Sequence, residues 1–229
     1  MLPQVLLIGA TGRTGRLVLE EALERGHSVT ALVRKPNSDL PQHPSLAIAT
    51  GDPCTTADIE ATLQNMKPTI PIVIISTLGQ TRMSESPFAA TVSPPRFMES
   101  SAQAVLAASQ KLEDSSQIKK LIVMSMFGAG DSFSNLNFLM RWIMKYTNMA
   151  QTLEDQNLVD EAVKAGPLPF VLIRPAMLVG ERAAPLKLYG STGKGSGFMP
   201  SVSAKSVAGF LLDAAVKEDF DGTTPVITN

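Results

Sequence analysis

A glycine-rich turn near the start of the chain limits the folds that this sequence can adopt. The segment Gly9-Ala-Thr-Gly-Arg-Thr-Gly15 follows the apolar run Gln4–Ile8 and opens a stretch with helical periodicity. In a strand–turn–helix unit of this kind, Gly12 lets a ligand approach the backbone and Gly15 lets the helix pack closely on the strand. The free N–H groups at the start of the helix attract phosphate. We therefore expect a dinucleotide pyrophosphate site formed by Gly9, Thr11, Gly12, Arg13, Thr14 and Gly15, the alternative being a turn that binds nothing.

The rest of the chain alternates short β-branched runs with longer amphipathic stretches, which is typical of βαβ units and a parallel sheet. Strands are expected at Gln4–Ile8, Ser28–Val33, Leu46–Thr50, Ile72–Ser76, Lys120–Ser125, Phe170–Ile173 and Pro225–Thr228. Helices are expected at Thr14–Glu24, Thr56–Met66, Phe97–Lys111, Asn137–Thr147, Leu153–Lys164 and Ala204–Val216. The strand runs are continuously apolar, which indicates strands covered on both faces. The predicted fold class is α/β, with a Rossmann-type doubly wound parallel sheet.

Two stretches interrupt this alternation. Residues 79–96 contain three prolines, and residues 178–203 are rich in Gly, Ser and Pro. Both follow expected strands, at the carboxyl edge of the sheet, where ligands of open α/β folds bind. Long irregular loops at that edge are commonly functional. We therefore expect a single domain, residues 1–229, in which these two segments form a cap over the site.

Composition excludes several classes of function. The net charge of −1 gives no electrostatic reason to bind nucleic acid. Cys54 is the only cysteine, and the two histidines, His27 and His43, have no metal-ligand spacing, so neither a disulfide nor a metal site is expected. The apolar runs are strand-sized, far below the ~20 residues of a membrane span, and no targeting segment is evident. The expected location is cytoplasmic, with no membrane partner.

The residues after the second expected strand indicate which dinucleotide binds. Proteins that prefer NAD place an acid there, whereas this chain has Arg34 and Lys35, with Arg13 in the glycine turn. Guanidinium groups suit a 2′-phosphate, so NADPH/NADP is the predicted cofactor. The alternative is that these cations form an ordinary solvated rim. Asp52 is expected near the adenine, and Thr77, Leu78 and Gly79 along the middle of the cofactor.

Several segments together resemble the atypical short-chain dehydrogenase/reductases of the NmrA-like NAD(P)H-binding group, and within it the flavin reductase/biliverdin reductase B type. They are Gly9–Gly15, Leu32–Arg34, Gly51-Asp52, Ile122–Ser132, Ile173–Pro175 and Pro225–Asn229. The resemblance implies a Rossmann core with a small C-terminal substrate cap. It also implies that the nicotinamide lies between two sets of residues, Ser125, Met126 and Phe127 on one side and Pro175, Ala176, Met177 and Leu178 on the other.

The catalytic pair of ordinary short-chain dehydrogenases is missing. Those enzymes use a Tyr-x-x-x-Lys pair, in which the lysine lowers the pKa of the tyrosine so that the phenol exchanges a proton with the substrate. Tyr146 and Tyr189 are the only tyrosines here, and the residues four positions later are Ala150 and Gly193. Any catalysis therefore needs another source of protons.

Three residues remain as candidates for catalysis, each with an alternative. Ser125 is suited to orient a carbonyl or the nicotinamide amide, or else it satisfies backbone groups at a strand end. Tyr146 lies on an otherwise apolar helix, where core or interface packing is the alternative. Asp155 is a possible proton relay, although solvation is the ordinary fate of an acid on a charged helix. It precedes Gln156 where the group often has Asp-His, so a histidine acid is excluded.

Methionines and lysines suggest the character of a substrate pocket. Six methionines, Met124, Met126, Met140, Met144, Met149 and Met177, are expected around the pocket, as an adaptable apolar wall or as plain core. Three lysines in or beside the late segment, Lys187, Lys194 and Lys205, either meet an acidic substrate or form solvated surface.

The predicted function is an NADPH-dependent oxidoreductase that transfers hydride to a planar, conjugated small molecule. Flavins, quinones, enones and conjugated tetrapyrroles accept a proton from water after the hydride arrives, so they need no resident acid. One alternative is an NmrA-like binding protein that senses NADP(H) without turnover, although such regulators tend to carry a longer C-terminal part. Another is a biosynthetic tailoring enzyme on the same scaffold. A monomer or small homo-oligomer is expected.

Overall fold

The computed structural model of the protein describes residues 2–36, 39–67, 69–84, 86–112, 117–180 and 182–229. Within these residues eight strands form one sheet in the order β3-β2-β1-β4-β5-β6-β10-β8. Their bounds are β1 Gln4–Ile8, β2 Val29–Val33, β3 Leu46–Thr50, β4 Ile72–Ser76, β5 Ile118–Met124, β6 Phe170–Pro175, β8 Lys187–Tyr189 and β10 Val226–Thr228. Neighbouring strands are parallel except β8, which is antiparallel to β10.

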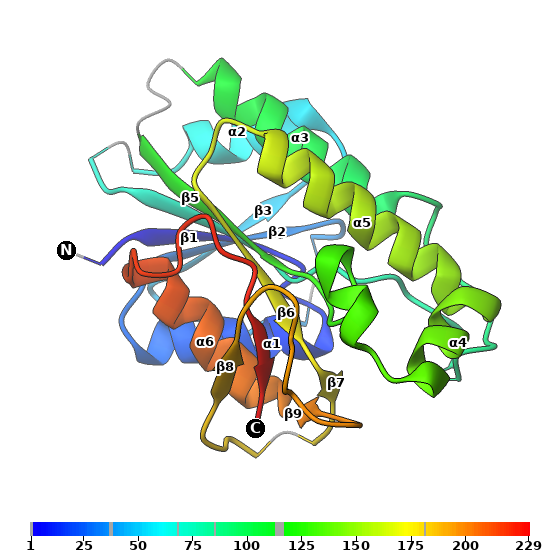
Figure 1. Cartoon of the computed structure of the whole chain (residues 1–229). Helices are drawn as coiled ribbons and strands as arrows, with labels where there is room; N and C mark the ends of the chain where they lie inside the picture. The colour runs from blue at the N-terminus through cyan, green and yellow to red at the C-terminus, as the bar shows by residue number, and fades with distance from the viewer. Residues whose placement is uncertain (1, 37–38, 68, 85, 113–116, 181) are drawn as a thin grey trace.

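Helices cover both faces of the sheet (Figure 1). Two lie on one face and pack together, α1 Arg13–Glu24 and α6 Ala204–Val216, and three lie on the other, α2 Thr56–Gln64, α3 Phe97–Lys111 and α5 Met149–Ala165. Alternate residues of β1 supply two separate cores, because successive side chains of a strand point to opposite faces. Val5 and Leu7 pack on the side of α1 and α6, and Leu6 and Ile8 on the side of α2, α3 and α5. The predicted doubly wound Rossmann-type sheet is thus confirmed.

The strand order places a switch point at β1. The chain moves outward from β1 through β2 to β3 and then returns to β4 on the other side of β1. Helices after β1 and β4 therefore leave the sheet in opposite directions, which opens a crevice at the carboxyl ends of these strands. The glycine turn begins there, directly after Ile8.

A smaller layer extends beyond the carboxyl edge of the sheet. It contains a 3-10 turn at Gly130–Asn135, α4 Phe138–Tyr146, and the two-stranded pair of β7 Met177–Leu178 and β9 Ser201–Val202. Figure 1 shows α4, β7 and β9 together at this end of the molecule.

The structure differs from the sequence expectations mainly at element ends and in the late segment. Helix α5 begins at Met149, four residues before the expected Leu153. The reason is that the side chains of Met149 and Leu153 both pack in the small cluster around Phe127 and Met144. Residues 178–203, expected to be irregular, include β8 and β9, which pair with strands elsewhere in the chain. Strand β3 lies at the edge of the sheet, and Ile48 is 45% exposed rather than covered.

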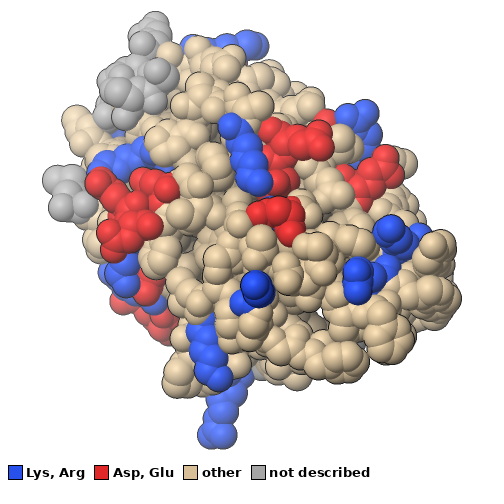
Figure 2. All heavy atoms as spheres, viewed as in Figure 1, with Lys and Arg blue, Asp and Glu red and all other residues tan. Residues whose placement is uncertain are grey.

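In the ranges given above, no helix combines the length and apolar character that crossing a bilayer requires. Those ranges also contain no cluster of three or more His, Cys, Asp or Glu side chains that could hold a metal ion. Figure 2 shows acidic side chains beside basic ones over the upper and left parts of one face, while its lower part shows basic side chains among uncharged ones.

Candidate cofactor and substrate site

The glycine turn is built against the end of β4. The hydroxyl of Thr77 lies 3.2 Å from the carbonyl oxygen of Ile8 and 3.3 Å from that of Gly9. The N–H of Gly12 donates to the carbonyl of Gly9 at 2.9 Å, and α1 begins at the next residue. No side chain caps this helix at Gly12. The first N–H groups of α1 therefore face the crevice without a side-chain acceptor, and they suit an anion.

The glycines fit a bound pyrophosphate for steric reasons. A Cβ on Gly15 would lie 2.0 Å from the carbonyl oxygen of Gly9, so the helix packs on the turn only with glycine there. Gly9 itself has φ +93°, and a Cβ on it would lie 2.8 Å from the hydroxyl of Thr77. At Gly12 a Cβ would lie 3.3 Å from the Gly9 carbonyl oxygen, a tight contact, so glycine fits the turn best there too.

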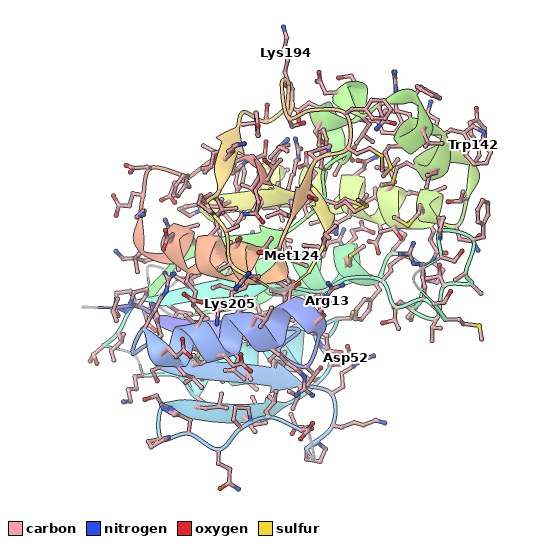
Figure 3. All side chains as sticks on the ribbon, turned by 90° about the horizontal axis from the view of Figure 1, so that it is seen from below. Arg13, Asp52, Met124, Trp142, Lys194 and Lys205 are labelled. Atoms are coloured by element: carbon pink, nitrogen blue, oxygen red, sulfur yellow. The ribbon has the colours of Figure 1, made fainter. Side chains whose placement is uncertain are left out.

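Basic side chains border the adenine end of the crevice. Arg34 and Lys35 follow β2 and are exposed, and the Arg34 guanidinium lies 5.9 Å from the centre of the Phe97 ring. Arg13, at the start of α1, and Asp52, after β3, lie toward the same edge of the sheet (Figure 3). Cations from the end of β2 and from the start of α1 thus lie at the carboxyl edge of the sheet.

Asp52 and Cys54 form a small loop beside this edge. The carboxylate of Asp52 accepts the N–H of Cys54 at 2.9 Å, and the N–H of Asp52 donates to Asp58 at 2.8 Å. Burial, followed by the charge of Asp52 and a hydrogen bond with it, raises the pKa of the Cys54 thiol to about 11. The thiol is therefore protonated at neutral pH and is a poor nucleophile.

The residues expected to flank the nicotinamide come together. The chain just beyond β5 continues alongside the end of β6, because the N–H of Ser125 donates to the carbonyl of Ile173 at 2.7 Å and that of Phe127 donates to the carbonyl of Pro175 at 2.9 Å. The hydroxyl of Ser125 is buried and has no hydrogen-bond partner within the described structure. A buried hydroxyl without a partner is costly, so it is suited to bond a ligand group.

An apolar cavity of about 490 Å³ opens beside these residues. It is lined by Arg82, Pro87, Met126, Phe127, Asn135, Leu136, Asn137, Met140, Ile143, Met144, Met149, Pro175, Ala176, Met177, Leu178, Gly197, Phe198, Met199 and Pro200. Five of the six methionines predicted at the pocket are in this lining. Met124 is not, because it packs against the core of the sheet, and Met199 was not foreseen.

The two cap segments are tied to the helices that border the cavity. Asn137 accepts the N–H of Met140 at 2.9 Å and so caps α4, while its amide nitrogen donates to the carbonyl of Phe198. Asn148, at the start of α5, donates to the carbonyls of Phe88 at 2.9 Å and Ala89 at 3.1 Å. Described residues of both segments, such as Arg82 and Phe198, line the same cavity.

A buried arginine, which sequence reasoning did not single out, holds this region in place. Arg174 in β6 is fully buried, pairs with Asp131 and with Asp160 at 2.8 Å, and donates to the carbonyl of Ser191 at 2.6 Å. Partial burial raises the pKa of the Asp131 carboxyl, but hydrogen bonds with Ser191 and Arg174 and the charge of Arg174 hold it, on balance, below the ordinary 3.8. The signal in the sequence was a cation inside the apolar strand run, which requires buried partners.

None of the three candidate catalytic residues, Ser125, Tyr146 and Asp155, is in the described lining of the cavity, although Ser125 directly precedes its lining residue Met126. Tyr146 is 70% exposed, with its ring 6.2 Å from that of Trp142, so neither core packing nor a place in the cavity describes it. Asp155 is buried rather than solvated: its carboxylate accepts the N–H groups of Met98 at 3.1 Å and Glu99 at 2.9 Å. The expected solvated acid is corrected to a cap for α3, with its oxygens occupied.

Comparison with known proteins adds a family and a set of similar folds. The family model described as NAD(P)H-binding matches residues 9–218. No curated protein matches the chain in sequence. The fold resembles the anaerobilin reductase ChuY from Escherichia coli O157:H7, with a TM-score of 0.76, 19% identity and coverage of 98% of this chain and 96% of that one.

Two further structures show the same fold. One is a short-chain dehydrogenase/reductase from Veillonella parvula in complex with NADP, with a TM-score of 0.73, 15% identity and coverage of 100% and 95% of the two chains. The other is a putative NAD-dependent epimerase/dehydratase from Bacillus halodurans, with a TM-score of 0.72, 19% identity and coverage of 99% and 94%.

Proposed function

Because the chain belongs to the NAD(P)H-binding family, we propose that it is an NADPH-dependent reductase of a conjugated small molecule. The observation that carries this proposal is the lining of the 490 Å³ cavity. Among the residues that line it in the described structure there is no Asp, Glu, His, Lys, Cys or Tyr. Such a cavity shelters a hydride transfer but offers no general acid to the substrate.

The cofactor is proposed to lie along the carboxyl edge of the sheet. Its pyrophosphate meets the N-terminus of α1 at Gly12, and its 2′-phosphate meets Arg13, Arg34 and Lys35. These cations support NADPH over NADH, since a carboxylate at the same place would repel the phosphate. The nicotinamide then lies between residues 125–127 and 175–178, where the free hydroxyl of Ser125 is available to bond its carboxamide or a substrate oxygen.

NADPH supplies a hydride when it is bound, and the protein supplies position and surroundings. The apolar walls from α4 and the cap segments hold a flat substrate beside Met126 and Pro175 and leave one side of it open to solvent. In a conjugated acceptor the charge that follows hydride arrival spreads over several atoms, so the proton can come from solvent. A simple ketone concentrates that charge on one oxygen, and no acid in the lining is placed to neutralise it.

The proposal is tested by following NADPH absorbance against a panel of flavins, quinones, enones and simple ketones. We expect consumption with at least one conjugated acceptor, faster with NADPH than with NADH, and slower consumption with ketones. Gly12→Asp places a carboxylate against the pyrophosphate and should abolish both binding and turnover. Ketone reduction at the rate of the conjugated acceptors would contradict the proposed chemistry.

The absence of an acid in the lining also fits a protein that senses NADP(H) without turnover. A titration with NADPH separates the two possibilities. Tight binding with no consumption on any acceptor of the panel would favour the sensor.

A further inference from the structure

We propose that the cavity binds an acidic substrate: an aromatic or conjugated molecule whose carboxylate or sulfonate group pairs with Arg82. The inference rests on the proposed function in that it takes this cavity as the substrate pocket. It goes further by naming a charge that the substrate carries and the residue that selects it.

Among the residues that the structure describes, no carboxylate forms an ion pair with Arg82. Its side chain lines the cavity and is half-buried, and the hydrogen-bond partner of its guanidinium is the sulfur of Met149. A thioether is a weak acceptor, and none of the carboxylates in the described part of the chain lies within ion-pairing distance of Arg82. By contrast, Arg96 pairs with Glu99, and Arg174 pairs with two carboxylates. Partial burial of an unpaired guanidinium is unfavourable, and an anionic ligand group removes that penalty.

Among the described residues of the lining, Arg82 alone can pair with an acidic group of the substrate. The two amides in the lining belong to Asn135 and Asn137, and Asn137 is already committed to Met140 and Phe198. Lys194 points outward from the molecule (Figure 3), and the described lining includes neither it nor Lys187 or Lys205. The cavity as described is thus an apolar chamber with a single positive charge, which matches an apolar molecule with one acidic group.

The backbone around Arg82 is held in place. Arg82 forms an antiparallel bridge with Thr91, and the N–H of Met83 donates to the carbonyl of Ala90 at 3.0 Å. The base of this loop is joined to α5 by a hydrogen bond of 3.0 Å from Thr152 to Gln80. Because the backbone that carries the guanidinium is already ordered, binding an anion costs less conformational entropy.

The test compares two fluorescent probes that differ only in an anionic group. Anilinonaphthalene sulfonate carries a sulfonate, and its uncharged parent, N-phenylnaphthylamine, does not. Both fit the size range of a 490 Å³ cavity. We expect the wild-type protein with NADP to bind the sulfonate more tightly. Arg82→Gln should raise the Kd of the sulfonate about tenfold or more and change that of the uncharged probe by less than about twofold.

Two further variants locate the effect. Arg141→Gln removes an exposed cation of α4 that does not line the cavity, so both affinities should stay unchanged. Met140→Trp fills part of the cavity and should weaken both probes. Thermal unfolding of each variant checks that it is folded.

The proposal is overturned if Arg82→Gln leaves the sulfonate affinity unchanged or lowers both affinities equally. It is also overturned if Met140→Trp leaves both unchanged, because the probes then bind outside the cavity. The measurement needs no turnover, so it is distinguishable from a failure of the reductase proposal. A protein that never oxidises NADPH but loses sulfonate affinity in Arg82→Gln keeps an acid-binding cavity.

Discussion

Asp155 joins two helices that are far apart in the chain. It lies on α5, and its carboxylate accepts the first N–H groups of α3, from Met98 and Glu99. A negative charge at a helix N-terminus also interacts favourably with the helix dipole. The same carboxylate accepts a hydrogen bond of 3.2 Å from Gln80, at the base of the loop that carries Arg82. Asp155 therefore links α5 to the start of α3 and to the base of this loop.

Asp155→Ala should lower the free energy of unfolding by about 2 kcal/mol or more, because two buried N–H donors lose their acceptor. Asp155→Asn keeps one acceptor oxygen and should cost less. Urea denaturation measures both, and Glu154→Ala, at an exposed neighbour, serves as the control with little change. If Asp155 instead relayed protons, kcat would fall in Asp155→Asn, and one arm of the dependence of kcat on pH would disappear.

The sequence could not reveal this role, and the reason is physical. The carboxylate and the N–H of Glu99 are separated by 56 positions in the chain, so only the tertiary fold brings them together. The geometry of the glycine turn between β1 and α1, in contrast, was predictable because it depends on consecutive residues. The same distinction holds for Arg82, whose place in the cavity depends on a loop closing against Met149, 67 positions away.

At the scale of elements, the buried strands and longer helices follow from periodicity alone. The bounds of β1, β4, α3 and α6 agree with the sequence expectation because each has an unbroken apolar run or a complete apolar face. The short strands β7, β8 and β9 did not follow from the sequence. Two or three residues carry too little pattern, and their strand character comes from a partner elsewhere, such as β10 for β8.

The stability that Asp131 contributes through its ion pair with Arg174 should depend on pH. The pKa of Asp131 is lowered in the folded protein, so its contribution to stability is present above about pH 4 and is lost as the pH falls through the lowered value. Asp131→Asn removes that contribution. The difference in free energy of unfolding between wild type and variant should be positive at pH 6 and shrink toward zero below pH 4.

The size of this effect is limited because the Asp131 side chain is 45% exposed, and we expect no more than about 1 kcal/mol. Urea denaturation at a series of pH values measures it. Asp39→Asn is a suitable control, since that carboxylate is 99% exposed. A difference that stays constant down to pH 3 would contradict the assignment of Asp131 as the titrating group.

At the scale of the whole molecule, the cofactor is proposed to bind across elements that meet only in the folded state. The glycine turn follows β1, the cations Arg34 and Lys35 follow β2, and the free hydroxyl of Ser125 follows β5. A ligand that binds only this arrangement stabilises it by mass action. Cofactor preference is therefore measurable as stability, with no knowledge of the substrate.

NADP at one hundred times its Kd should raise the free energy of unfolding by about 2.7 kcal/mol, and NAD at the same concentration should raise it less. The double variant Arg34→Gln, Lys35→Gln should bring the effect of NADP close to that of NAD, because it removes two of the three cations proposed to contact the 2′-phosphate. Lys119→Gln removes an exposed lysine in the first part of β5, away from the carboxyl edge, and should leave both effects unchanged. If NAD stabilises the wild type as much as NADP does, the cations after β2 form an ordinary solvated rim and the preference for the phosphorylated cofactor is wrong, although the pyrophosphate site at α1 would stand.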